Sequence, residues 1–246
     1  MVIMGQMRLD KFLCDRTGCT RKEAKLYIKN GQVLVDDERM KRPEYKIDEE
    51  KSCVFLNGKK IKGDTLVYIM LHKPKGVVSA TKDYRDETVI DLVSHMTHKD
   101  IFPVGRLDKD TTGLLLLTND GEMSHELLSP KKHVDKVYEV IASGKITTEE
   151  QRQFEQGLDI GEKNLTKPAI LDIVEAADTE SKVLVTIREG KFHQIKRMFH
   201  KVGMDVLELK RISMGPLLLD DSLQEGEARF LTKEEIKQLK ELYVRE

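Results

Sequence analysis

The sequence lacks the features that direct a protein into a membrane or out of the cell. No apolar run approaches the roughly 18 residues that a membrane-spanning helix needs. The start of the chain has no basic segment followed by an apolar core, so no signal peptide is predicted. We therefore expect a cytoplasmic protein without a membrane partner. Met1, Met4 and Met7 are alternative points at which translation could begin.

Cysteine is scarce, and its three copies, Cys14, Cys19 and Cys53, include no C-x-x-C pair. An odd number of scattered cysteines predicts reduced thiols rather than a disulfide framework or a zinc site. The chain also has no P-loop, no G-x-G-x-x-G loop and no cluster of metal-ligand residues. We therefore predict neither a cofactor nor a metal site.

Neither sign of charge dominates, because the net charge of the whole chain is −1. Residues 1–62 nevertheless hold 15 Lys and Arg against 10 Asp and Glu, so the front of the chain is basic. A basic segment on a near-neutral protein is a candidate surface for a polyanion such as RNA. The alternative is an ordinary solvated surface, and charge alone does not separate the two.

The pattern of elements predicts an α+β protein with two domains. After an extension at 1–6, residues 7–62 form a small unit in which two short helices pack on a small sheet. Thr20 and Glu23 form a capping box that opens the second helix, which ends at Asn30 and Gly31. A polar run at 57–64 contains two glycines and is the candidate linker region; the linker itself is placed at 63–67.

Residues 68–246 form the second domain, in which short strands outnumber helices without a regular βαβ rhythm. A final helix at 233–244 is opened by Thr232, with Glu235 three residues later. The predicted strands lie at 66–71, 113–117, 137–142, 169–174 and 183–187.

The densest polar segment is GRLDKDTTGLLLLTNDG at residues 105–121, where charged and hydroxyl side chains stand directly before four leucines. The segment imitates the first half of a calcium-binding loop, but its twelfth position is Asn119 rather than a bidentate Glu. A calcium site is therefore not predicted. A surface turn that leads into a buried strand would account for the shape of the segment but not for its polar residues.

Two further stretches stand out. REGKFHQIKRMFHK at 188–201 predicts the end of a strand and then a helix, whose apolar face carries Phe192, Ile195, Met198 and Phe199. On composition alone, its basic residues form an ordinary solvated face. LHKPKGVVS at residues 71–79 is a K-P-x-G turn between two apolar runs, with a structural turn as its default interpretation.

Together these stretches resemble the RsuA-type pseudouridine synthases, a bacterial family that modifies a single uridine in small-subunit ribosomal RNA. The resemblance is carried by G-R-L-D-x-x-T-x-G-L-L-L-L-T-N-D-G, by K-P-x-G before it and by E-G-x-x-x-Q-I-K-R-M after it. Residues 7–50, with RLDKFL at 8–13, resemble the S4 RNA-binding domain of this family. The resemblance implies a mixed, mainly antiparallel sheet with flanking helices in the second domain. His72 departs from the family, which usually has Asn before Lys-Pro.

The resemblance implies that the chain isomerises uridine to pseudouridine, a reaction that needs neither a redox cofactor nor a phosphate donor. Asp108 matches the catalytic Asp, which could act as a nucleophile or abstract a sugar proton. A carboxylate withdrawn from water stays ionised beside a cation, and Lys196 matches that partner, with Arg197 as the alternative if the register shifts by one. Tyr138 matches the aromatic residue that stacks on the extruded uracil, although a core Tyr gives the same pattern. Asp110 is interpreted as a support of the loop.

Other residues are candidates for contacts with RNA. Arg106 would bind the phosphate backbone or fill the space that the flipped base leaves, and a structural ion pair is the alternative. Lys73, Lys191 and Arg211 are candidate phosphate contacts, although lone lysines are most often solvated. Ile195 would pack under the base. The candidate RNA-binding residues of the front domain are Arg8, Lys11, Arg21, Lys22 and Lys25.

The preferred target is 16S rRNA, naked or in a small-subunit assembly intermediate, and the preferred state is a monomer. The form H-Q-I-K-R-M at 193–198 favours this target over the large-subunit (23S) rRNA, which is the first alternative. A non-catalytic RNA-binding assembly protein is the second, although the intact R-L-D core argues against it. A sugar hydrolase built on Asp108 and Asp110 is the third alternative. It would need two carboxylates at least about 5 Å apart across a sugar, and adjacent positions in one tight turn argue against that arrangement.

Overall fold

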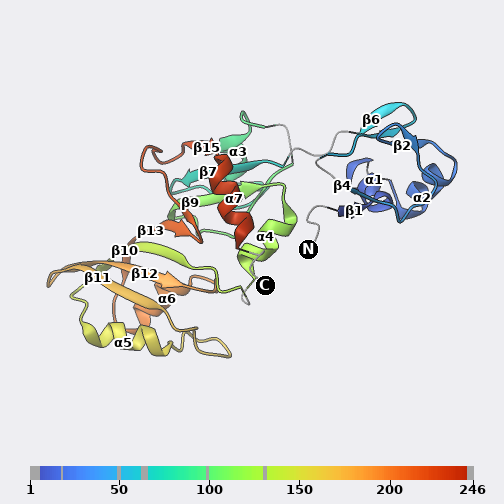
Figure 1. The fold of residues 1–246 in the computed structure, drawn as a ribbon. Coiled ribbons are helices and arrows are strands. Elements are labelled where there is room, and N and C mark those ends of the chain that lie inside the picture. The colour runs from blue at the N-terminus through green and yellow to red at the C-terminus, as the bar shows by residue number, and fades with distance from the viewer. Residues whose placement is uncertain are drawn as a thin grey trace. The chain divides into compact units, whose positions relative to one another are not determined.

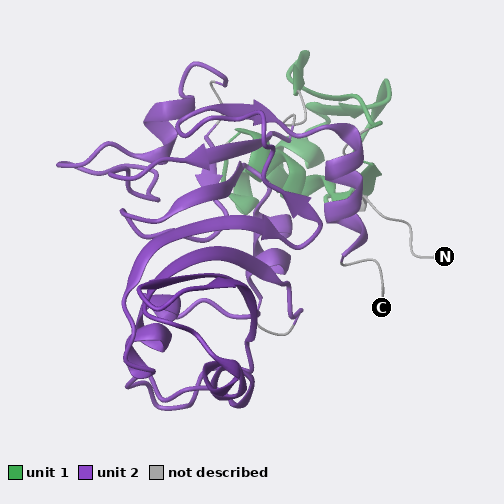
Figure 2. Ribbon diagram, turned by 90° about the vertical axis from the view of Figure 1, so that its left-hand side faces the viewer, with its two compact units in different colours: residues 1–65 green, residues 66–246 purple. Residues whose placement is uncertain are grey.

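A computed structural model of the chain describes residues 6–17, 19–48, 51–61, 66–97, 100–129 and 132–242. The chain divides into two compact units, residues 1–65 and 66–246 (Figure 2). Within the described residues, no helix is both long and apolar enough to span a membrane.

The first unit contains the two predicted short helices, α1 (Leu9–Thr17) and α2 (Arg21–Lys29). The side chain of Thr20 accepts a hydrogen bond from the backbone of Glu23, and the Glu23 carboxylate accepts one from the backbone of Thr20. The predicted capping box is therefore confirmed. Its four-stranded sheet has the order β3 (Glu38–Arg39), β2 (Val33–Val35), β5 (Val54–Leu56) and β6 (Lys59–Ile61), while β1 (Gln6–Arg8) pairs with β4 (Lys46–Asp48).

The polar run at 57–64 begins as a hairpin rather than as a linker. Asn57 and Gly58 join β5 to β6 with φ angles of 52° and 76°, and left-handed residues suit a tight hairpin because its twist matches that of the strands. The first unit therefore extends at least to Ile61, which pairs with Val54. Residues 1–5 and 63–65 of the predicted extension and linker lie outside the described residues.

The second unit is built on one sheet (Figure 1). Among the strands that the structure describes, pairing in this sheet is antiparallel except between β13 and β9, which run parallel. This confirms the mixed, mainly antiparallel sheet of an α+β fold. Among the described residues its main path is β11 (Ile170–Ala176), β12 (Glu180–Ile187), β10 (Lys136–Ser143), β13 (Val206–Met214), β9 (Thr112–Thr118), β7 (Tyr68–Lys73) and β15 (Ala228–Phe230), with β14 (Leu217–Leu218) beside β13 and β8 (Phe102–Pro103) beside β9.

Helices pack on the sheet in two separate hydrophobic clusters. One cluster includes residues of α4 (Gly121–Leu128) and α7 (Lys233–Glu241). The other includes residues of α3 (Val89–Val93), α5 (Thr148–Gln156) and α6 (Gln194–Lys201). Leu114 and Leu116 belong to the first cluster, and Leu115 and Leu117 to the second. Successive strand side chains point to opposite faces, so the four leucines bury both faces of β9.

Gly113 is required where β9 meets β13, because it lies opposite Arg211 in the parallel pairing. Its φ is 106°, and a Cβ atom there would overlap the carbonyl oxygen of Arg211 and lie 2.6 Å from its backbone nitrogen. Only glycine lets the two backbones approach this closely. The contact pairs β9, the strand that follows Asp108, with β13, the strand that follows α6.

Three local predictions are corrected. Strand β7 runs to Lys73 rather than ending at residue 71, because His72 and Lys73 still pair with Leu114 and Gly113 and are buried. Helix α6 begins at Gln194, so Phe192 lies before the helix and is 71% exposed instead of packing on its apolar face. The final helix ends at Glu241, and residues 243–246 lie outside the described residues.

Candidate active site

A cavity of about 570 Å³ lies in the second unit at the loop that precedes β9. Its walls come from this loop, from β10 and β13, and from the start of α6. Most of the residues predicted for the catalytic domain line it, namely Arg106, Asp108, Tyr138, Lys191, Ile195, Lys196 and Arg211.

Asp108 lies between two nitrogen-bearing side chains from the start of α6. Its Oδ2 is 3.4 Å from Lys196 Nζ, and its Oδ1 is 3.6 Å from His193 Nε2. Lys196 is closer still to Asp110, whose Oδ1 lies 2.5 Å away. The hydrogen bond from Lys196 lowers the pKa of Asp110. Lys196 therefore bridges both carboxylates of the loop.

An aromatic and an aliphatic side chain form the apolar part of the cavity wall. Tyr138 is on β10, opposite Arg211 of β13, and is 7% exposed. Ile195, in the first turn of α6, is 4% exposed. A planar base entering the cavity would meet both of them.

Two buried polar groups of the wall have no hydrogen-bond partner among the described residues. Arg211 donates from Nε to the carbonyl of Leu114 at 2.8 Å, and its Nη2 has no acceptor. The Thr111 hydroxyl is also buried and unpaired. Because burying an unpaired donor costs free energy, such groups favour a ligand that supplies polar partners. Lys136 adds a second buried cation, and burial lowers its pKa to about 8.

The structure contradicts the prediction that Lys73 contacts phosphate. Its side chain is fully buried, and Nζ donates to the carbonyls of Pro74, Thr111 and Lys109 at 2.9, 3.0 and 3.4 Å. An ammonium group has three N–H donors, so none is left for an RNA phosphate. Burial lowers the pKa of Lys73 to about 8. Lys73 instead stabilises the loop that carries Asp108 through these hydrogen bonds.

Two further cations hold loops beside the cavity. Arg197 points away from Asp108: it pairs with Glu162 at 2.9 Å and donates to the carbonyls of Phe192 and Ile160. Lys191 Nζ donates to the carbonyls of Asn164 and Leu165. Arg106, by contrast, is exposed and has no ion pair within the described part of the chain.

Known proteins match this chain over nearly its whole length. The family model described as RNA pseudouridylate synthase matches residues 67–201. The "Ribosomal small subunit pseudouridine synthase A" of Vibrio cholerae is 45% identical, over 94% of this chain and 98% of its own length. An "Uncharacterized RNA pseudouridine synthase YtzG" of Bacillus subtilis is 44% identical, over 96% and 99%. A crystal structure of a pseudouridylate synthase matches with a TM-score of 0.66 and 36% identity, covering 95% of this chain and 99% of that one.

The chain belongs to the RNA pseudouridylate synthase family. It is therefore an isomerase by family, with Asp108 and its neighbours in the cavity described above. The S4 domain model matches residues 7–53, so this synthase carries an RNA-binding module in its first unit.

In the S4 domain of the synthase, the five predicted RNA-binding residues divide into two groups. Arg8 and Arg21 both pair with Asp10, at 2.9 and 3.0 Å, and the Asp10 side chain is 1% exposed. The hydrogen bond from Arg8 lowers the pKa of Asp10. These two arginines therefore neutralise a buried carboxylate. Lys11, Lys22 and Lys25 are exposed, with no ion pair among the described residues.

Several residues of the cavity in this synthase carry no distinguishing signal in the sequence. His193 and Phe192 were assigned to a basic helix and its apolar face, although His193 has the left-handed φ of 48°. Lys136 and Thr111 stand beside recognised residues, and no local pattern distinguishes them from ordinary strand and loop residues. His72, the departure from the family, is buried with Nδ1 2.8 Å from the carbonyl of Leu223, so this histidine is partnered on that side.

Proposed function

We propose that this synthase isomerises one uridine of small-subunit (16S) ribosomal RNA to pseudouridine, with Asp108 as its catalytic carboxylate. The observation that carries the proposal is the position of Asp108. It lies in a cavity of about 570 Å³, 3.4 Å from the Lys196 ammonium, with Tyr138 and Ile195 in the same wall. A carboxylate beside a cation in a cavity suited to a planar base is what this isomerisation requires.

The reaction breaks the bond from C1′ to N1 of uracil and forms one from C1′ to C5. The target base leaves the RNA stack and enters the cavity, where Tyr138 and Ile195 contact its faces. Asp108 either attacks C1′ or removes a sugar proton, and uracil departs with the electron pair of the broken bond. The base turns and C5 bonds to C1′ while the Asp108–C1′ bond breaks or, in the second route, while Asp108 returns the proton to the sugar. The C5 hydrogen is then released to solvent, and N1 gains a proton.

Buried hydrogen-bond donors in the cavity wall would retain the detached base. Uracil that leaves with an electron pair is an anion whose charge is shared with its carbonyl oxygens. The buried, unpaired Nη2 of Arg211 supplies positive charge, and so does the buried ammonium of Lys136, which also donates to the carbonyls of Leu127 and Val134. The Thr111 hydroxyl can donate to a carbonyl or accept from an N–H. These residues would hold the base while it turns.

The choice of target rests on the relatives and on the S4 domain. Proteins of Vibrio cholerae and Escherichia coli named small-subunit synthases are 45% and 38% identical to this chain. An S4-like domain at 7–62, a linker at 63–67 and a catalytic domain at 68–246 fit a cytoplasmic monomer that docks on folded 16S rRNA or an assembly intermediate. Exposed Lys11, Lys22 and Lys25 would contact phosphates. A 23S target and a non-catalytic assembly role are the competing functions.

The decisive experiment compares the wild type with Asp108→Asn on naked 16S rRNA and on assembling small subunits. Pseudouridine is mapped by carbodiimide adducts and primer-extension stops. We expect one stop that the wild type produces and the variant does not. A stop only in 23S rRNA would show that the target is large-subunit rRNA. No stop on any ribosomal RNA would favour the non-catalytic role. An Asp108→Asn variant as active as the wild type would refute the assignment of the carboxylate.

A further inference from the structure

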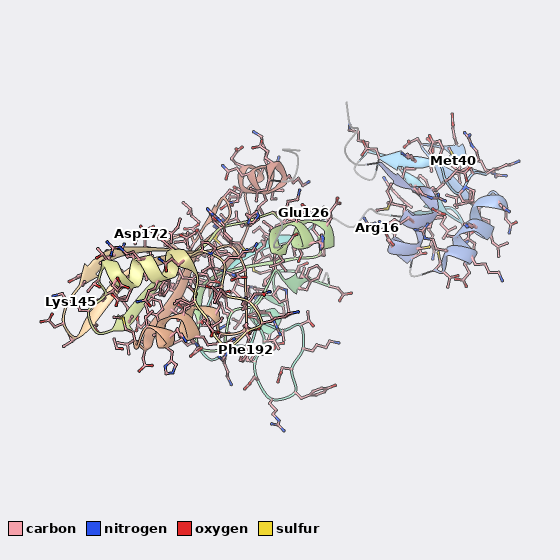
Figure 3. All side chains as sticks on the ribbon, turned by 90° about the horizontal axis from the view of Figure 1, so that it is seen from below. Arg16, Met40, Glu126, Lys145, Asp172 and Phe192 are labelled. Carbon is pink, nitrogen blue, oxygen red and sulfur yellow. The ribbon has the colours of Figure 1, made fainter. Side chains whose placement is uncertain are left out.

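Phe192 is a large aromatic side chain that the fold leaves in solvent at the cavity. It is 71% exposed, lies just before α6 and is one of the residues that line the cavity; Figure 3 labels its side chain. Its ring stacks on that of His193, with centroids 3.8 Å apart and planes 18° from parallel. His193 Nε2 in turn lies 3.6 Å from Asp108 Oδ1. One face of the Phe192 ring is thus covered by a residue in contact with the reacting carboxylate.

The backbone around Phe192 is held in place before any ligand arrives. Its carbonyl accepts a hydrogen bond from Arg197 at 3.0 Å. The side chain of Gln194 accepts from the backbone of Lys191 and donates to Glu189. His193 adopts a left-handed φ of 48°, a conformation that most non-glycine residues avoid and that clusters at functional sites. The exposed ring is therefore part of an ordered loop.

The surroundings of the ring suit a nucleobase rather than an apolar protein segment. Exposed Arg106 lies in the same cavity wall and has no ion pair among the described residues, so its charge would attract a polyanion. The ring spacing of 3.8 Å is close to the ~3.4 Å between successive bases of a stacked strand. A third ring on the outer face of Phe192 would continue such a stack.

We propose that the Phe192–His193 pair binds, by stacking, the base of a nucleotide next to the target uridine. The inference rests on the proposed function, because a flipped uridine leaves its neighbours without a stacking partner on one side. Phe192 is then a positioning residue: it holds the strand at the mouth of the cavity while Asp108 acts on the sugar inside.

The expected loss on removing the ring follows from base–aromatic stacking. Alanine substitution at such contacts weakens binding by about 5- to 150-fold. Phe192→Ala should therefore raise KM by that factor and change kcat by less than about threefold. Phe192→Trp keeps a ring and should remain near the wild type. Phe230→Ala removes a ring that is 51% exposed on β15, away from the cavity wall, and should leave KM unchanged.

The test measures release of tritium from C5 of the target uridine in a synthetic RNA that contains the mapped site. Each flanking nucleotide is replaced in turn by an abasic one, and every RNA is assayed with the wild type and with Phe192→Ala. If the proposal is right, one abasic replacement raises the KM of the wild type as much as Phe192→Ala does. The same replacement then adds nothing to the defect of the variant, as a double-mutant cycle requires for groups in contact.

Three results would overturn the proposal. The first is an unchanged KM in Phe192→Ala, and the second is an abasic penalty that adds fully to that of the variant at both flanking positions. The third is a Phe192→Trp variant as impaired as Phe192→Ala, which would assign the residue to loop packing. Absence of tritium release with the wild type, after mapping finds no pseudouridine, would refute the proposed function itself, and the stacked nucleotide with it.

Discussion

Gly113→Ala should be among the most destabilising single substitutions in the catalytic unit. The added Cβ would overlap the carbonyl oxygen of Arg211 and come within 2.6 Å of its backbone nitrogen. Both atoms belong to the main chain of β13, which is held on its other side by β10. No flexible side chain can move aside, so the strands themselves must separate.

The magnitude combines two costs. Alanine at a φ of 106° costs about 1–3 kcal/mol of backbone strain, and overpacking between fixed elements costs about 1–3 kcal/mol more. We expect a loss of about 2–6 kcal/mol in the free energy of unfolding. For a unit of the size of residues 66–246, this corresponds to a fall of about 4–24 °C in Tm.

Alanine substitutions at two other glycines distinguish the cost of the steric overlap from the cost of the left-handed backbone conformation. Gly144 has a φ of 78° but open space around its missing Cβ, so Gly144→Ala should cost only about 1 kcal/mol. Gly121 has open space and no left-handed φ, and alanine there, at the start of α4, should be neutral or slightly stabilising. Thermal unfolding of the three variants by circular dichroism gives the comparison.

The reasoning would be refuted if Gly113→Ala melted within 2 °C of the wild type. A Tm drop equal to that of Gly144→Ala would likewise show that the close approach of β9 and β13 is not what demands glycine. Activity gives a second measurement, because Arg211 lines the cavity and its backbone must move. At temperatures where Gly113→Ala is still folded, its kcat should be lower than that of Gly144→Ala.

Two further outcomes are expected. Burial lowers the pKa of Lys73 from 10.5 to about 8, so between these pH values the unfolded chain binds a proton that the folded chain has lost. The stability of the wild type relative to Lys73→Met should therefore rise with pH in this window, by about 1.4 kcal/mol per pH unit; equal differences in urea unfolding at pH 7.5 and 9.5 would contradict this. Replacing exposed Lys22 and Lys25 of the S4 domain by alanine should weaken rRNA binding and reduce the slope of log affinity against log salt by about 2. Filter binding from 50 to 200 mM salt checks it, and an unchanged slope would exclude both lysines as phosphate contacts.

Features that depend on a few neighbouring residues were predictable from the chain alone. The capping boxes of Thr20 with Glu23 and of Thr232 with Glu235 form as expected, because each joins groups three residues apart. The central strands were also predictable from short stretches of sequence. A continuous apolar run such as that of β9 is typical of a strand whose two faces are both buried, each in its own hydrophobic cluster. The family was also recognisable, since its motifs are continuous stretches of sequence.

The roles of the cationic residues were decided only by tertiary structure. Lys73, Lys191 and Lys196 are the same residue type in similar basic stretches, yet their partners are three loop carbonyls, two other carbonyls and a pair of carboxylates. The partners of Lys196 lie 86 or more residues away, so no local pattern contains them. Arg197 follows Lys196 directly but leaves α6 in another direction, toward Glu162.

The sequence by itself determined the element types, the two-part organisation and the family, because backbone propensity, capping and apolar periodicity act within a few residues. Only the tertiary structure decided which charged groups stay in contact with solvent, which are buried and stabilise a loop through hydrogen bonds, and which line the cavity. Burial and pairing change the free energy of a charge by several kcal/mol, and both depend on strands that meet across the sheet. Phe192 is a further example, because the tertiary structure leaves this aromatic side chain, of a type common in cores, exposed in the cavity that Asp108 also lines.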